Sequence, residues 1–152
     1  MALYFSNSNL PVPALPTIGV GLHWYYSSNT AITLYSDHPS GSCFVPCFKA
    51  STGEAVIVEI PSSALPMTMD LSTSGAGGLD TGAIAASKFY CVRMIAKADG
   101  GSPALLATLN AGTPTIPAAY AGGVQSDLLW GVSCSTDISD PYDTFDDIQG
   151  FV

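Results

Sequence analysis

The chain has 152 residues, of which 11% are charged and 47% are hydrophobic, and its formal net charge is −8 at pH 7. This length suits one domain, which can bury a core without needing a metal or a disulfide. The negative charge argues against electrostatic binding to nucleic acid or to an anionic membrane. Because so few residues are charged, we expect partner chains to cover part of the surface.

The chain start, MALYFSNSNLPVP, lacks the basic flank and long apolar stretch of a secretory signal. No apolar run in the sequence reaches the roughly 18 residues of a membrane span. We therefore expect a chain that is made in the cytoplasm and stays there until assembly, so that its four cysteines need not be oxidised.

Residues 1–22 are predicted to form an extended N-terminal arm. Pro11, Pro13 and Pro16 are spaced through apolar residues, and proline at this spacing favours an extended chain over a helix or a paired strand. The arm can either dock on a neighbouring chain or fold back on its own domain, and both alternatives remain open.

Short strands are predicted through the rest of the chain, because Gly and Pro interrupt it too often for ordinary helices. In the first half the candidate strands are 31–35, 43–45, 55–60 and 67–71, each bounded by Gly, Pro, Ser or Asp. Residues 72–78 follow them as a wide loop.

A β-hairpin is predicted from 88–97 and 104–109, joined by turn residues at 99–103. In the first of these strands, alternation predicts a core face and a wetter face. The core face has Tyr90, Val92, Met94 and Ala96. A further core strand is predicted at 128–134, where alternation places Trp130 on the apolar side.

Together these elements predict an all-β fold. About seven short strands indicate a single β-sandwich or jelly-roll-like domain at 23–137, with extended arms at 1–22 and 138–152.

The C-terminal arm is acidic but carries apolar anchors. The acids are Asp137, Asp140, Asp143, Asp146 and Asp147, and the anchors that we expect to dock on a neighbour are Tyr142, Phe145, Ile148 and Phe151. Calcium binding is an alternative for the aspartates, but the order DISDPYDTFDD lacks the glycine and the final glutamate of an EF-hand loop. We predict a solvated acidic arm and no metal, and this arm too can either dock on a neighbouring chain or fold back on its own domain.

Metal and phosphate motifs are weak elsewhere too. His38, Cys43 and Cys47 could supply three ligands, but the spacing is loose and no second cysteine pair follows, so we expect cysteines that pack in the structure. Cys91 and Cys134 are predicted to pack as small apolar residues, while a bridge between any two of the four remains open. The stretch SGAGGLDTG lacks the lysine of a phosphate loop. No cofactor is predicted.

Catalytic residues do not form a recognisable set. The histidines are His23 and His38, and neither lies in a nucleophile motif. Glu54 and Glu59 could be imagined as a glycosidase pair, but nothing fixes their separation. We therefore predict that the chain is not an enzyme.

An aromatic cluster is the main candidate for ligand or interface contacts. It consists of His23, Trp24, Tyr25 and Tyr26, in the sequence GLHWYY. Exposed aromatic rings here could stack on sugars, whereas a buried cluster would have a structural role.

Residues 75–137 contain four segments in a fixed order, which are GLDTGAIAASKFYCVRMIAK, ADGGSPALLATL, PTIPAAY and LLWGVSCSTD. This order resembles a module of tailed-bacteriophage structural and tail-fibre-like proteins. The turn residues are Gly78, Leu79, Asp80, Thr81 and Gly82; the strand residues are Phe89, Tyr90, Ile95, Leu105, Leu106 and Thr108; the crossing segment has Pro114, Pro117 and Tyr120. Trp130-Gly131 departs from the aliphatic-glycine pair of the family, and the basic residues that commonly precede it are missing.

The resemblance implies a non-enzymatic structural protein of a virion. Small size favours a head decoration protein or a short tail or neck appendage. It would form a homo-oligomer, with a trimer as the leading candidate, and would contact capsid or tail proteins of the same particle after synthesis in the host cytoplasm. The alternative is a carbohydrate- or receptor-binding module of a phage appendage.

Overall fold

The computed structural model describes residues 22–28, 30–37, 41–85, 88–109, 113–126 and 130–133. The described part is built from strands and two short 3-10 helices, and it confirms the predicted all-β fold. The predicted arms at 1–22 and 138–152 lie outside the described residues, except that Leu22 already belongs to the first strand. No described helix is long and apolar enough to cross a membrane.

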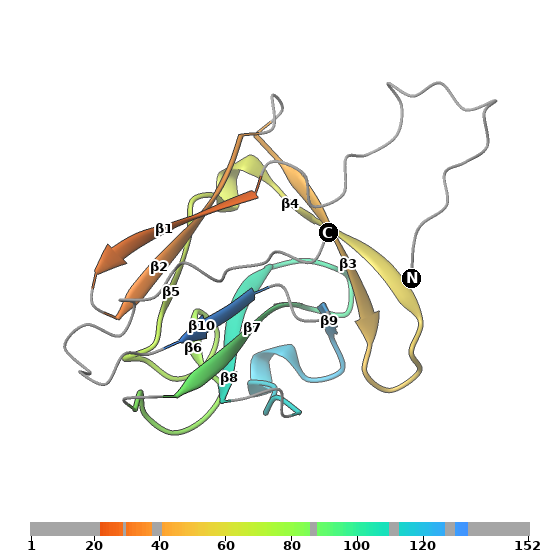
Figure 1. The fold of residues 1–152 in the computed structure, drawn as a ribbon. Coiled ribbons are helices and arrows are strands. Elements are labelled where there is room, and N and C mark those ends of the chain that lie inside the picture. Colours follow the sequence, from red (N-terminus) through yellow and green to blue (C-terminus); the bar gives the residue numbers. More distant parts are fainter. Residues whose placement is uncertain are drawn as a thin grey trace.

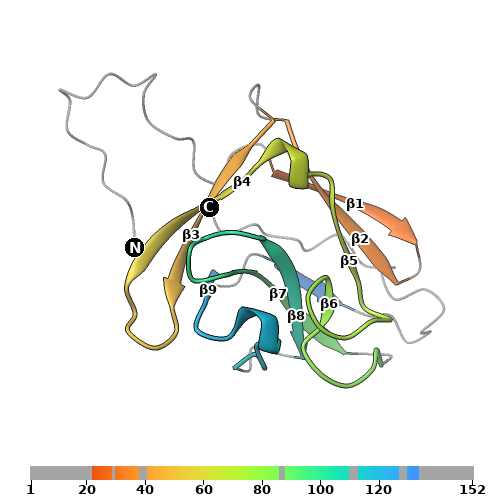
Figure 2. The same cartoon turned by 180° about the vertical axis from the view of Figure 1, so that it is seen from behind.

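The strands form two sheets. The smaller one has the order β1-β2-β5, from β1 (Leu22–Ser28), β2 (Ala31–Ser36) and β5 (Met67–Asp70), all antiparallel. In Figure 1 the hairpins β1–β2 and β3–β4 slope away from each other above β7 and β8, and Figure 2 shows the same arrangement from behind.

The larger sheet has seven strands in the order β4-β3-β9-β7-β8-β6, with β10 also pairing with β7. Its members are β3 (Cys43–Lys49), β4 (Ala55–Ile60), β6 (Gly78–Leu79), β7 (Phe89–Ala96), β8 (Ala104–Leu109), β9 (Val124–Ser126) and β10 (Trp130–Ser133). The 3-10 helices are η2 (Ser62–Ala64) and η3 (Ala118–Tyr120). The predicted hairpin of β7 and β8 is confirmed, with Met94 opposite Leu105.

A single apolar core lies between the two sheets. The smaller sheet contributes Ile32, Leu34 and Met69, and the larger one contributes Val92 and Met94, all almost completely buried. Alternation along the strands explains this, because every second side chain points to the same face. The result is the sandwich-like packing that the strand pattern predicts.

The predicted wet face of β7 is wrong in part. Cys91 and Ile95 on that face are buried, and so is Leu106 of the neighbouring β8, while Arg93 is half-buried. Strands inside a sheet that is covered on both faces lose the apolar/polar alternation. The sequence alone does not show that this face is covered. The alternation from Phe89 to Lys97 therefore predicted a more solvent-exposed face than the structure has.

Candidate binding surface on the three-stranded sheet

The outer face of the β1-β2-β5 sheet gathers aromatic and polar side chains from separate strands. Antiparallel pairing places His23 opposite Tyr35 and Tyr25 opposite Thr33, and Thr33 is in turn opposite Thr68 of β5. Residues directly opposite each other share a face. We call this surface the tyrosine face, and it consists of His23, Tyr25, Ser27, Thr33, Tyr35, Thr68 and the adjoining Asp37.

Strand alternation decides which member of the predicted aromatic cluster reaches solvent. Tyr25 points outward and is 54% exposed, whereas Trp24 is half-buried and packs against the core together with Leu22. Trp24 is therefore a packing residue and does not provide the sugar-stacking ring that the sequence suggested. The side chain of Tyr26 lies outside what the structure describes.

Tyr35 is the residue that the sequence analysis missed. Its ring meets that of Tyr25 edge-to-face, with centroids 4.9 Å apart and an interplanar angle of 84°. Tyr35 is 40% exposed, so the pair forms a corner of two rings at the surface. A sequence signal could have found Tyr35. Residues 22–26 alternate between two faces, which identifies a strand able to pair with 31–36.

An imidazole–carboxylate pair lies at one end of the face. His23 Nε2 is 2.7 Å from Asp37 Oδ2, and the two side chains are 48% and 69% exposed. An ion pair this open to water contributes little to stability, on the order of 0–1 kcal/mol. Its main effect is to orient both groups beside Tyr35.

Hydroxyl groups continue the polar surface on the other side of the tyrosines. The Thr33 side chain is hydrogen-bonded to Ser27 and, at 3.1 Å, to Thr68. Thr33 itself is buried, while Ser27 and Thr68 are exposed. The three hydroxyls therefore link β1, β2 and β5 and leave polar groups next to Tyr25.

The three cysteines in the described part of the chain lie in the interior. Cys43, Cys47 and Cys91 are buried free thiols, which confirms that they pack as structural residues. Burial raises the pKa of Cys43 to about 11, with a smaller contribution from the Glu59 charge, and raises the pKa of Cys47 to about 12. Burial also raises the pKa of Cys91, against the opposing effect of Arg93. His38 and Cys134 lie outside the described residues.

Metal-binding groups do not come together in the described residues. There, no three or more His, Cys, Asp and Glu side chains approach closely enough to hold an ion. The predicted docking residues Tyr142, Phe145, Ile148 and Phe151, like the aspartates around them, lie outside the described part of the chain.

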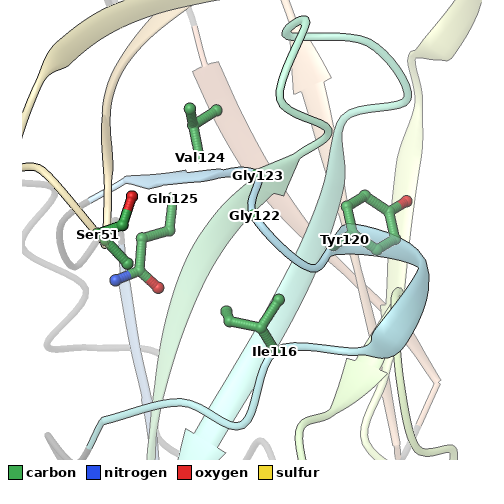
Figure 3. A pocket seen from close by; sticks show the side chains of 8 residues that line it. Ser51, Ile116, Tyr120, Gly122, Gly123, Val124 and Gln125 are labelled. Carbon is green, nitrogen blue, oxygen red and sulfur yellow. The ribbon is translucent and has the colours of Figure 1, made fainter.

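A small cavity of about 160 Å³ lies beside β9 on the larger sheet. In Figure 3, Ser51 from the β3–β4 turn lies beside Gln125, and Tyr120 lies across from them. Ligand pockets are usually about 300–1,000 Å³. This cavity is smaller, so we regard the tyrosine face as the stronger candidate site.

Comparisons of the chain with protein-family models, with curated proteins and with solved structures found no significant match.

Proposed function

We propose that the chain is a non-enzymatic structural protein of a bacteriophage virion. It acts as a head decoration protein or as a short tail or neck appendage. It assembles as a homo-oligomer, with a trimer as the leading candidate, and contacts capsid or tail proteins of the same particle. One observation carries this proposal: the residues of the phage-like module pair strands and shape a turn in the fold.

Those residues form a scaffold around β8. Leu79 of the GLDTG turn pairs in parallel with Ala107, and the amide of Asp80 donates to the Ala107 carbonyl at 2.8 Å. Asp80 also ties the turn to the crossing segment, because its Oδ1 accepts from the Thr81 amide at 2.8 Å and its Oδ2 from the Thr115 amide at 2.9 Å. The bond to Thr115 joins residues that are 35 positions apart in the chain.

Gly78 of the same turn has a packing reason for lacking a side chain. A Cβ atom at this position would lie 2.4 Å from the Thr73 carbonyl oxygen, which no ordinary contact allows. The conspicuous residues of the turn therefore serve backbone geometry, and this use supports a structural role for the module.

The candidate nucleophiles are poorly placed for catalysis, which supports a non-enzymatic role. The buried Cys43 and Cys47 thiols stay protonated at neutral pH, because their pKa values are raised, and a thiol is a poor nucleophile. Ser27 shares a face with His23 but lies four residues along β1, about 13 Å away at 3.3 Å per residue. Hydrogen-bonded contact with the imidazole needs about 3 Å.

The edge of β4 is a candidate surface for self-assembly. Among the described strands, β4 pairs with β3 alone, so no described strand lies along its other edge. Its sequence AVIVEI carries one charge, and Ile57 is 38% exposed. Natural proteins usually protect such edges with charges, proline or a partner strand. A second copy that adds a strand here would protect it.

The test is the composition of purified particles. Phage particles from a culture that produces the chain are banded on a density gradient, and the ratio of this chain to the major capsid protein is measured by mass spectrometry. We expect this ratio to be constant across the particle band. The control is an abundant cytoplasmic host protein, whose ratio to the major capsid protein should decrease during purification. Absence of the chain from the band would contradict the proposal.

A further inference from the structure

The tyrosine face has an exposed surface that the proposed virion role does not use. Its two rings come from different strands and are held by a paired backbone, so their positions are fixed before any ligand arrives. Preorganised groups bind at lower entropic cost than groups on a loop. The question is what kind of ligand fits such a surface.

We propose that the tyrosine face binds a neutral carbohydrate. A pyranose ring has an apolar C–H face and a rim of hydroxyls. The C–H face can lie on one tyrosine ring while the other ring, nearly perpendicular at 84°, contacts the edge of the sugar. A single flat ring would offer no such corner, so the edge-to-face pair restricts the orientation of a bound sugar.

Polar groups lie on both sides of the two rings on the same face. The Asp37 carboxylate uses one oxygen to contact His23, and at 69% exposure it keeps acceptor capacity for further hydrogen bonds. On the side of Tyr25, the exposed Ser27 and Thr68 can both donate and accept. This pairing of apolar rings with mixed donors and acceptors matches the chemistry of a sugar.

The charge distribution excludes an acidic ligand as the preferred one. None of the four Lys and Arg residues of the chain lies in β1, β2 or β5, and the net charge of the chain is −8. A sialylated or phosphorylated glycan would approach Asp37 with no Lys or Arg on these three strands to balance its charge. Neutral sugars avoid this repulsion.

The small aromatic area favours a sugar over a protein partner. Fully exposed tyrosine side chains offer roughly 200 Å² each, so the half-exposed Tyr25 and Tyr35 together offer about the same area. A stable protein interface buries about 800 Å² on each partner around a desolvated aromatic core. Two rings are sufficient to hold one or two sugar units.

The test uses the intact chain on an array of immobilised neutral glycans built from glucose, galactose, mannose and N-acetylglucosamine. Sialylated and phosphorylated versions are printed beside them. Hits are measured again by calorimetry with the free oligosaccharide. We expect binding to neutral glycans, competition by the free sugar, and at least about a tenfold lower affinity for Tyr35→Ala.

Two further variants separate ring stacking from general damage. Tyr25→Phe keeps the ring and should stay within about threefold of the wild-type affinity. Phe89→Ala removes a ring that is 45% exposed on β7 of the other sheet and should not change the affinity. The proposal is overturned by silence on the neutral glycans, by binding to acidic glycans alone, or by equal losses in Tyr35→Ala and Phe89→Ala. Because sugar binding and presence in particles are measured separately, either result can fail without the other.

Discussion

At the scale of single residues, Asp70 shows how a short polar side chain stabilises the end of a strand. Its Oδ1 accepts from the Ser72 amide at 2.9 Å and from the Ser72 hydroxyl at 2.7 Å, and the Thr30 side chain adds a further hydrogen bond. Desolvation alone would raise the pKa of Asp70, but these hydrogen bonds outweigh it and hold the pKa below its usual range.

The lowered pKa of Asp70 predicts a loss of stability in acid. A carboxyl group with a lower pKa in the folded chain contributes its full stability above its unfolded pKa of about 3.9, and loses it as the pH falls through the folded value. Urea unfolding at pH 7 and pH 3 measures this. We expect Asp70→Asn to lower the free energy of unfolding by about 1 kcal/mol at pH 7 and to have a smaller effect at pH 3. An equal effect at both pH values would contradict the assignment.

The aromatic cluster shows what a sequence can say about single side chains. The composition of GLHWYY pointed to His23 and Tyr25, and strand pairing places both on the tyrosine face. It could not separate Trp24 from Tyr25, since that depends on which side of β1 faces the core. It also could not supply Tyr35, whose contact with Tyr25 exists only once β1 and β2 pair.

At the scale of elements, the β7–β8 hairpin was predicted, whereas β1 and the shortest strands were not. The pattern of 88–97 and 104–109 identified β7 and β8 nearly to the residue, because many side chains report the same period. β6 has two residues and β9 has three, which is too few for any period to be seen. Their partners are distant in sequence, so only the folded chain defines them.

β9 nevertheless joins the two halves of the larger sheet, because it pairs with both β3 and β7. Gly123, just before it, passes very close to the end of β7. A Cβ atom there would lie 2.1 Å from the Ala96 carbonyl oxygen and 2.8 Å from that of Tyr120. Neither oxygen belongs to a flexible side chain, so an added methyl group must displace backbone.

This close approach predicts that Gly123→Ala is clearly destabilising. We expect the free energy of unfolding to fall by about 3 kcal/mol, because β9 has to move away from β7. Gly122→Ala is the matched control: Gly122 has φ +73° and no atom within 4 Å of an added Cβ, so it should cost only about 1 kcal/mol of backbone strain. Denaturant unfolding of both variants gives the comparison. Equal losses would mean that β9 is not held tightly against β7.

At the scale of the whole molecule, the composition predicted the type of fold better than it predicted the surface. Frequent Gly and Pro with alternating strands led to the all-β assignment, which the two sheets confirm. The low charge content suggested covered surfaces without saying where they lie. In the structure, Ile57 on the β4 edge is an exposed aliphatic side chain outside the core, and this makes the edge a candidate for a covered surface.

The β4 edge gives a prediction for the size of the molecule in solution. If copies of the chain pair along β4, light scattering should give a mass of at least twice the monomer value of 15.7 kDa. Ile57→Lys places a charge on the pairing edge and should lower the measured mass toward the monomer, because a buried unpaired lysine opposes strand addition. Leu109→Lys, at an exposed aliphatic position of β8 on the far side of the sheet order from β4, adds the same charge and should leave the mass unchanged. A monomeric wild-type chain, or an equal effect of both lysines, would contradict assembly through β4.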